Sequence, residues 1–222
     1  TSSPVRTNPG GIAGIWAEEN SREALFKAMK RRETFGTSGP RIIPRFFGGW
    51  AFPQDMCGRT DFATAGYEQG VPMGGDLPHP AEPGQAPVFA LSALRDSSDE
   101  GAPLQRIQII KGWIDDEGRM HQEVHDVAGS AANGAGVDLN TCQRHGSGHG
   151  RLCSVWKDPD FDSKRQAVYY ARVVENPSCR WSTYQCNQLN REERPPSCND
   201  PAVPKTIQER AWTSPIWVSS ES

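Results

Sequence analysis

Five histidines and a short run of aspartates are the residues of this 222-residue chain best suited to hold a metal ion or to move a proton. His121 and His125 are four residues apart, which on a helix would place both imidazoles on one face. Their segment, MHQEVHDV, follows a turn and alternates like a strand, in which residues i and i+4 lie roughly 13 Å apart. Imidazoles at that separation do not clamp one ion, so we expect them to make ordinary surface or cross-strand contacts.

A second pair of histidines lies in a glycine-rich run. His145 and His149 belong to the segment RHGSGHG, which we interpret as the tip of a hairpin closed by a disulfide between Cys142 and Cys153 rather than as a ligand pair. Ser130 and Ser147 lie in similar runs, and neither has the Gly-x-Ser-x-Gly pattern of a nucleophile elbow around it.

The aspartates have the spacing of a known cation motif without its other parts. Asp158, Asp160 and Asp162 are placed like the start of a calcium loop, but the glycine and the distal glutamate of that loop are missing. We favour a helix-capping turn for this segment. The residues alone therefore predict no complete catalytic constellation.

The cysteines indicate the cellular compartment of the protein. The chain has six of them and no CxxC pair of the kind that zinc sites usually contain. We therefore favour disulfides over free buried thiols or a metal site, and a periplasmic or extracellular location. Six cysteines allow fifteen connectivities. Our predicted pairs are Cys142–Cys153, Cys186–Cys198 and Cys57–Cys179.

Composition excludes several classes of partner. The formal net charge is −3, with the two signs interspersed, which argues against nucleic acid as the main partner. No apolar run approaches the roughly 20 residues that a membrane-spanning helix needs, and no signal peptide opens the chain. Eighteen prolines and twenty-two glycines favour short strands and long ordered loops over a helical bundle.

One well-formed helix is predicted near the N-terminus, over residues 21–32. We expect Asn20 as its N-cap, with Glu23 reaching back in a capping box. Its apolar stripe needs a partner, and it consists of Ala24, Leu25, Ala28 and Met29. We expect a strand over residues 34–43 to follow the helix. Upstream, we expect no strand on which this α/β unit would pack, so its partner is either the rest of the chain or a domain outside it.

The remaining sequence predicts a mainly β, α+β fold. Residues 51–87 are rich in glycine and proline, and we interpret them as a long ordered excursion with at most one short helix near residues 61–67. Residues 88–222 contain the strand signals typical of an antiparallel β-sandwich. The predicted strands cover residues 88–94, 104–114, 123–128, 152–156, 167–174 and 214–218. The side chains expected inside are Phe89, Leu91, Ile107, Ile109, Trp113, Tyr170, Val173 and Trp217.

Several long strings in the chain carry a family resemblance. They include GIAGIWAEENSREALFKAMKRRETFGTSGPRI, RFFGGW, GVPMGGDLP, LQRIQIIKGW, WKDPDFD, AVYYARVVENPSCRWSTYQC and TIQERAWTSPIW. Over residues 12–217 the chain resembles the C-terminal part of the bacterial domain-of-unknown-function 3604 family. Members of that family resemble the metal-dependent hydrolases of the polymerase-and-histidinol-phosphatase superfamily, in which a distorted α/β barrel is followed by a β-rich region.

This resemblance implies that catalysis and support belong to different parts of the protein. Residues 1–50 would hold the closing helix and strand of a barrel, and the metal ligands would lie in an upstream barrel domain of the same protein. Zinc or manganese is expected in that barrel, where a metal-activated water would hydrolyse a phosphate ester or another ester or amide. No metal site is expected in the present residues, which we expect to be inactive alone. Their role would be to support the barrel and to shape its entrance.

Four residues are the candidates for contact with a small anionic substrate. Glu18 and Glu19 stand at the N-terminus of the predicted helix, the end that faces the active-site rim in such barrels. Arg41, past a Gly-Pro turn, and Arg210, beside Trp212, are the cations placed to reach an anion. The competing interpretation is structural, with Glu18 or Glu19 in ion pairs and Arg210 stacked on a tryptophan.

Two other functions remain open. The chain is alternatively a carbohydrate- or polymer-binding module, in which exposed tryptophans form a platform, or a structural module held together by disulfides. The tryptophans considered for the platform are Trp113, Trp156, Trp181 and Trp212. Their burial separates the first alternative from the hydrolase interpretation, because packed indoles are anchors and exposed ones form a ligand surface.

Overall fold

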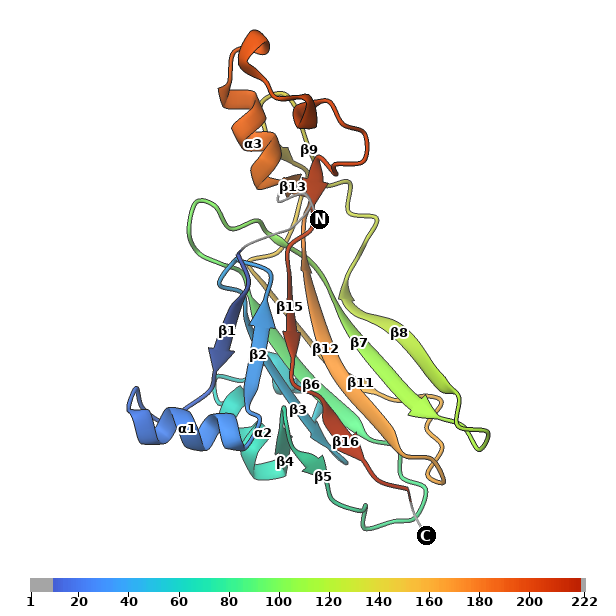
Figure 1. The fold of residues 1–222 in the computed structure, drawn as a ribbon. Coiled ribbons are helices and arrows are strands. Elements are labelled where there is room, and N and C mark those ends of the chain that lie inside the picture. The colour runs from blue at the N-terminus through green and yellow to red at the C-terminus, as the bar shows by residue number, and fades with distance from the viewer. Residues whose placement is uncertain (1–9, 221–222) are drawn as a thin grey trace.

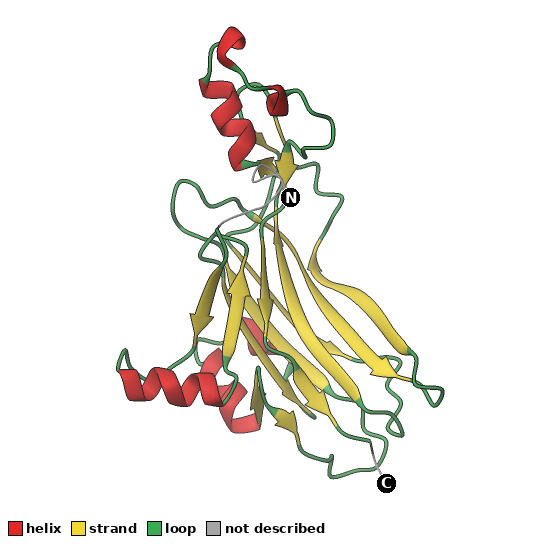
Figure 2. Ribbon diagram, viewed as in Figure 1, coloured by secondary structure: helices red, strands yellow, loops and turns green. Residues whose placement is uncertain are grey.

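Strands dominate the computed structural model, which describes residues 10–220 and carries three α-helices at the periphery (Figures 1 and 2). The helices are α1 (Arg22–Lys30), α2 (Phe62–Gln69) and α3 (Trp181–Gln188), with short 3-10 turns η2 (Gln54–Gly58), η3 (Arg191–Glu193) and η4 (Pro196–Cys198). The prediction of a mainly β fold with antiparallel sheets is confirmed, and neither large sheet closes into a barrel within the described residues.

The larger sheet has eight strands. They are β1 (Ile12–Ile15), β2 (Thr34–Thr37), β5 (Asp76–Leu77), β7 (Leu104–Ile114), β8 (Met120–Gly129), β12 (Ala167–Glu175), β15 (Arg210–Thr213) and β16 (Ile216–Val218). β12 is its centre, because β7 pairs along one side of it while β15 and β16 share the other. All its pairings are antiparallel except that of β16 with β5.

The smaller sheet has four strands in the order β11, β6, β3, β4. Their bounds are β3 (Ile43–Gly49), β4 (Gly70–Pro72), β6 (Val88–Leu94) and β11 (Arg151–Lys157). One face of this sheet packs on the larger sheet around a core that includes Phe46, Phe89, Leu91, Ile107, Ile109 and Tyr169. The opposite face is covered by η2 and α2 through a second core of Phe47, Phe52, Met56, Phe62, Ala65, Val88 and Ala90. The body is therefore three layers deep.

The N-terminal segment differs from the prediction in two ways. Ser21, not Asn20, is the N-cap of α1, because its hydroxyl accepts from Ala24 N at 3.2 Å. A strand does precede the helix: β1 pairs antiparallel with β2. Gly14 permits this pairing, since a Cβ there would lie 2.0 Å from the ring of its cross-strand partner Phe35.

The strand predicted over residues 34–43 is in fact two strands in different sheets. β2 ends at Thr37, and the chain turns at Gly39, whose φ is +151° and therefore suits glycine. It then enters β3 at Ile43 in the smaller sheet. Residues 10–50 thus contribute strands to both layers that residues 88–220 complete.

Most of the later strands lie where the sequence predicts them. The strands predicted at 88–94 and 104–114 are confirmed with the same bounds, and the short helix near residues 61–67 is confirmed as α2. β4, β5 and β15 were not predicted. Each has only two to four residues, and its extended backbone depends on a partner strand from elsewhere in the chain.

Five of the eight predicted core side chains are buried, namely Phe89, Leu91, Ile107, Ile109 and Val173. Trp113, Tyr170 and Trp217 are only half-buried, so the prediction was wrong for them. In β12 the fully buried ring is Tyr169, one residue earlier, because successive side chains of a strand point to opposite faces.

A small lobe extends beyond one end of the sheets (Figure 1). It contains α3, η3, η4 and two short hairpin-like pairs, β9 (Gly136–Val137) with β10 (Arg144–His145) and β13 (Ser178–Cys179) with β14 (Thr206–Ile207). Residues of this lobe line a small cavity of about 150 Å³ beside α3.

Two disulfides stabilise this lobe, and a third attaches the helical layer of η2 and α2 to the smaller sheet. The bridges are Cys57–Cys153, Cys142–Cys179 and Cys186–Cys198. Of the three predicted pairs, Cys186–Cys198 is confirmed, and Cys142–Cys153 and Cys57–Cys179 are wrong. Cys142 lies beside Cys179 rather than Cys153, because Cys153 faces the second core next to η2, at the opposite side of the smaller sheet. Three disulfides support an oxidising, extracytoplasmic setting. Among the described helices, none has the length and apolarity to cross a membrane.

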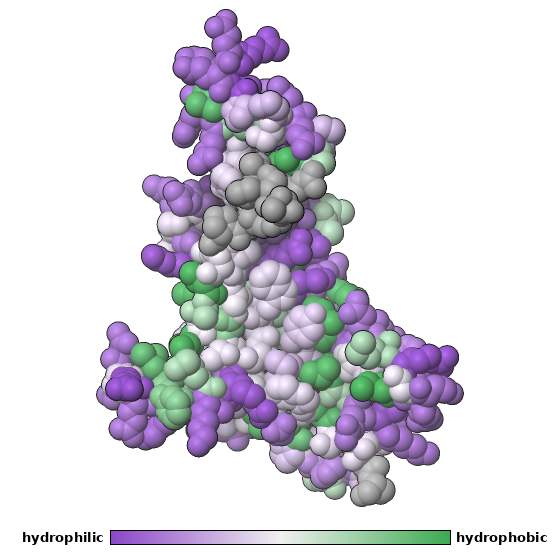
Figure 3. Space-filling model, viewed as in Figure 1, coloured by the Kyte–Doolittle hydropathy of each residue, from purple (hydrophilic) through white to green (hydrophobic). Residues whose placement is uncertain are grey.

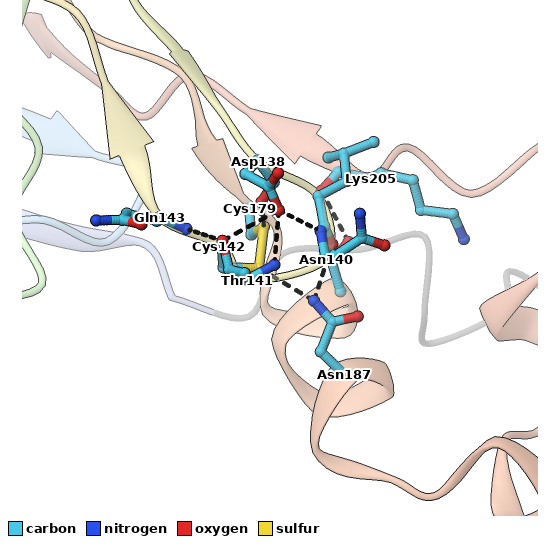
Figure 4. Close-up of a disulfide and its surroundings, with 10 residues drawn as sticks. Asp138, Asn140, Thr141, Cys142, Gln143, Cys179, Asn187 and Lys205 are labelled. Carbon is cyan, nitrogen blue, oxygen red and sulfur yellow. Dashed lines mark hydrogen bonds between the residues drawn. A yellow bond between two sulfur atoms is a disulfide. The ribbon is translucent and has the colours of Figure 1, made fainter.

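The loop before Cys142 is fixed by one carboxylate (Figure 4). Asp138 accepts from the backbone N–H groups of Asn140 and Thr141 at 2.9 and 2.8 Å, and these bonds lower its pKa. Asn187 of α3 donates to Leu139 O at 2.9 Å, which joins the loop to the helix. This arrangement holds Cys142 in the left-handed conformation, with φ of 57°.

A buried carboxyl lies where β12 leaves the body toward the lobe. Glu175 is 1% exposed, its Oε2 accepts only a long bond of 3.4 Å from Ala102 N, and its Oε1 has no hydrogen-bond partner among the described residues. Burial is the main cause that raises its pKa to about 8. The group is therefore protonated in the folded protein at neutral pH.

We expect the disulfides to stabilise in order of loop length. Replacing both Cys57 and Cys153 by alanine opens a link between residues 96 apart and should lower the free energy of unfolding by about 4–5 kcal/mol. Replacing Cys186 and Cys198, only 12 apart, should cost about 3 kcal/mol. Urea unfolding of both double variants measures the difference, and equal losses would contradict it.

Glu175→Gln should make the stability less dependent on pH. Below about pH 4.5 the carboxyl is protonated in both states, and between about 4.5 and 8 only the folded state keeps the proton. Wild-type stability therefore falls as pH rises through that window, and the variant should be more stable than the wild type by roughly 4–5 kcal/mol at pH 8.5 and not at pH 4.

Thermal melts at both pH values measure this effect. Glu192→Gln, at an exposed position, is the matched control and should behave like the wild type. A Glu175→Gln variant that is equally destabilised at both pH values would show that the carboxyl is ionised in the fold.

Candidate functional site

A cleft with both charged and apolar walls opens between the start of α1 and helix α2. Its volume is about 610 Å³, within the range of small-molecule sites, and it is open to solvent. The residues that line it are Trp16, Ala17, Glu18, Arg31, Glu33, Arg45, Ala63, Thr64, Tyr67 and Pro72. They come from the β1–α1 and α1–β2 connections, the end of α1, β3, α2 and β4. Segments of both sheets and the helical layer therefore meet there.

Arg45 is the central cation of the cleft. It lies on β3, one residue before Phe46, so it points to the side of the smaller sheet that carries α2. Its guanidinium carbon stacks 3.5 Å from the centre of the Trp16 ring, and Nη1 donates to the Tyr67 hydroxyl at 3.1 Å. The Trp16 indole is itself fixed, because its Nε1–H donates to Pro44 O at 3.0 Å.

Glu33 is the buried acid of the cleft. Its side chain is 5% exposed, and Arg31 Nη2 donates to its Oε2 at 3.2 Å. The Tyr67 hydroxyl donates to Glu33 Oε1 in a short hydrogen bond. Burial and the neighbouring Glu33 raise the pKa of Tyr67, so the hydroxyl remains a donor. Tyr67 thus stands between Arg45 and Glu33 and bonds both.

The structure brings two of the four predicted substrate-contact residues to this region. Glu18 lines the cleft, and Glu19 lines an adjoining pocket that also contains Glu18 and Arg31. Both acids are at the start of α1, as the sequence predicts.

The two predicted arginines lie elsewhere. Arg41 is exposed and its backbone N–H donates to Asp96 Oδ2 at 2.8 Å. Arg210 is exposed on β15, with Nε donating to Gln208 O at 3.2 Å. Neither lines the cleft, so the structure does not combine the four residues into one site.

The histidines are engaged separately. His121 stacks on Trp113 and shares a hydrogen bond of 2.7 Å with Asp115, which lowers the pKa of that carboxyl. His125 packs against Trp156 on the same face of β8. Within residues 10–220, no group of three or more histidine, cysteine or acidic side chains is arranged to hold a metal ion.

The three aspartates do not converge either. Asp158 is completely buried in an ion pair with Lys111, Nζ to Oδ2 being 2.7 Å, and it accepts from the Tyr169 hydroxyl at 2.6 Å. Asp162 instead accepts from Lys164 N at 3.0 Å and pairs with Arg165. The segment is neither a cation loop nor a helix cap.

The outer face of the larger sheet carries aromatic side chains. Trp212 pairs with Arg172 and Trp217 with Val168, and residues paired in this way point to the same side of a sheet. Tyr170 lies between them on β12, and all three rings are half-buried. In the space-filling view a pale band of intermediate hydropathy runs down the middle of the body (Figure 3).

Sequence reasoning missed four residues of the cleft: Trp16, Glu33, Arg45 and Tyr67. The sequence contains a signal for Arg45, because it is the only charged residue in the otherwise apolar strand IPRFFGG. The sequence contains no such signal for Glu33 and Tyr67, because these residues are 34 positions apart and meet only in the folded chain.

Comparison with known proteins gives one match. The family described as "Protein of unknown function (DUF3604)" matches residues 1–220, nearly the whole chain. No curated protein and no solved structure matches the chain. The resemblance noted in the sequence strings is thereby confirmed at the level of the family: this chain belongs to the DUF3604 family.

Proposed function

We propose that this chain is the C-terminal part of a metal-dependent hydrolase that acts on a phosphate ester or on another ester or amide. The observation that supports it is the outer side of α1. Phe26 is 62% exposed and Met29 is 49% exposed there, and Leu25 and Arg22 complete a surface depression with them. An amphipathic helix that leaves such residues in water is typical of one that packs on another domain.

The partner in this proposal is a barrel domain upstream in the same protein. Ala28 packs α1 onto the present body, while Phe26 and Met29 face away from it. Figure 1 shows α1 at the margin of the fold, where a second domain has access to it. A helix shared by two domains would join the barrel rigidly to the sheets.

The metal ion, zinc or manganese, would be held by the barrel and would activate the attacking water. The described residues of this chain lack a ligand set, so we assign them docking and substrate entry instead. Glu18 and Glu19 lie directly before the docking helix, next to the cleft. Groups at this place would border an opening between the two domains.

A binding module is the second candidate, and one observation favours it. The outer sheet face presents Trp212, Trp217 and Tyr170 half-buried, with Arg32 stacked 4.6 Å from the centre of the Trp217 ring. Half-buried rings on a sheet face, with polar side chains beside them, suit the apolar faces and hydroxyls of a polysaccharide. Of the tryptophans considered from the sequence, Trp113 instead stacks on His121 and Trp156 packs against His125.

The first function predicts a division of activity. A full-length gene product should bind Zn²⁺ or Mn²⁺ stoichiometrically and hydrolyse p-nitrophenyl phosphate or a simple carboxylic ester, whereas the 222 residues alone should do neither. Phe26→Ser with Met29→Ser should change the stability of the isolated chain by less than about 0.5 kcal/mol. It should weaken the full-length protein by about 3 kcal/mol, since two apolar side chains lose their burial.

Hydrogen exchange at α1 and calorimetry with metal give the readouts. Lys30→Ser, an exposed polar position on the same helix, is the matched control. Equal hydrogen-exchange rates at α1 in the isolated and full-length proteins would contradict the docking role. Tight metal binding by the isolated chain would contradict the assignment of the metal site to the barrel.

The second function predicts polysaccharide binding by the isolated chain. Trp212→Ala should weaken retention on an insoluble polysaccharide by about tenfold, because each lost ring removes roughly 1–1.5 kcal/mol of stacking. Tyr184→Ala, an exposed ring in the lobe, is the control and should leave retention unchanged. Sedimentation with cellulose, chitin and peptidoglycan measures this, and equal effects of the two substitutions would exclude the platform.

A further inference from the structure

The guanidinium of Arg45 is held in one orientation without a carboxylate partner. Trp16 covers one of its faces at 3.5 Å, and Nη1 is occupied by the Tyr67 hydroxyl. Among the described residues no acidic side chain pairs with it. The other arginine that lines the cleft, Arg31, does have such a partner, Glu33. Arg45 is therefore a half-buried cation without a counter-charge in contact.

Tyr67 explains why Glu33 does not supply that charge. The tyrosine hydroxyl accepts from Arg45 and donates to Glu33, so it separates the two charged groups. The second carboxylate oxygen of Glu33 is occupied by Arg31. Glu33 thus fixes the donor direction of Tyr67 and has no oxygen left without a donor.

The remaining donors of Arg45 form one edge. Nε–H and the Nη2 hydrogens have no hydrogen-bond partner within residues 10–220, and these two nitrogens present parallel donors. That edge matches the two oxygens of a carboxylate in a bidentate pair. Stacking on Trp16 fixes the plane of the group in advance, which reduces the entropy lost on binding.

The rest of the cleft suits an apolar group attached to that anion. Its walls include Trp16, Ala17, Ala63 and Pro72, and its volume of about 610 Å³ accommodates a small organic molecule. Thr64 and Glu18 give the margin some polarity.

Charge decides between a carboxylate and a phosphate. Arg31 and Glu33 neutralise each other, which leaves Arg45 as the positive charge and Glu18 as a negative charge on the same cleft. Glu18 repels any anion in the cleft, and this repulsion is about twice as large for a phosphate dianion as for a carboxylate monoanion, whose single charge Arg45 balances.

We propose that this cleft binds the carboxylate of a small organic acid, with Arg45 as the bidentate donor and Trp16 as the ring that orients it. Every group involved belongs to this chain, so the site does not depend on the proposed hydrolase.

The test is titration of the full 222-residue chain with benzoate, followed by the indole N–H signals in NMR. The Trp16 signal is assigned with a Trp16→Phe variant, and it should shift saturably with benzoate and not with neutral benzamide. Arg45→Gln should weaken benzoate binding at least tenfold. Arg45→Lys should recover only part of it, because an ammonium cannot bind bidentately. Arg59→Gln, which removes a surface arginine paired with Asp61, should have no effect.

A second variant keeps the test valid if Arg45→Gln perturbs folding. Ala63→Leu leaves Arg45 in place, fills the cleft from α2 and should abolish the benzoate shift while the melting temperature is kept. Unchanged binding in both variants would overturn the site. Tighter binding of phenyl phosphate than of benzoate would overturn the carboxylate assignment.

Discussion

The two sheets are held in one alignment by a buried ion pair. Asp158, at the end of β11 in the smaller sheet, contacts Lys111 of β7 at 2.7 Å and the Tyr169 hydroxyl of β12 at 2.6 Å, both in the larger sheet. Lys111 also donates to Asp160 O at 2.7 Å, so two of the three donors of the buried ammonium have oxygen partners. Removing one partner of such a pair typically costs about 3–5 kcal/mol, because it strands the other charge in the interior. Unlike the surrounding aliphatic contacts, these hydrogen bonds are directional, so they favour one relative position of the two sheets.

The sequence predicts best those elements whose signals are local. β6 and β7 alternate over seven and eleven residues, and α1 carries its cap and charges within its own segment. The short strands β1, β5 and β15 were not predictable in the same way, because a run of two to four residues becomes extended only when a neighbour supplies hydrogen bonds. The pairing of Cys57 with Cys153 has the same origin: their sulfurs meet across a helical layer whose position no local pattern specifies.

The candidate site was predictable only in part. Glu18 was identified because the start of a helix is recognisable, and the structure places it at the cleft. Arg45, Glu33 and Tyr67 come from β3, the turn before β2, and α2, so their meeting depends on the crossing of the chain between the sheets. Arg41 and Arg210 were chosen by their neighbours in sequence, and each is occupied with a nearby backbone or side-chain group instead.

The Cys57–Cys153 bridge lies on the same side of the smaller sheet as α2, so it also anchors a wall of the cleft. Cys57 belongs to η2, five residues before α2 begins, and Arg151 also donates to Cys57 O at 3.1 Å. α2 carries Tyr67 and Ala63, one wall of the cleft, and is otherwise held by a modest apolar cluster. In a thiol-rich environment that wall would lose its covalent anchor while the two sheets stayed intact. Ligand binding in the proposed cleft would then depend on oxidising conditions, because only the bridged form ties this wall to the smaller sheet.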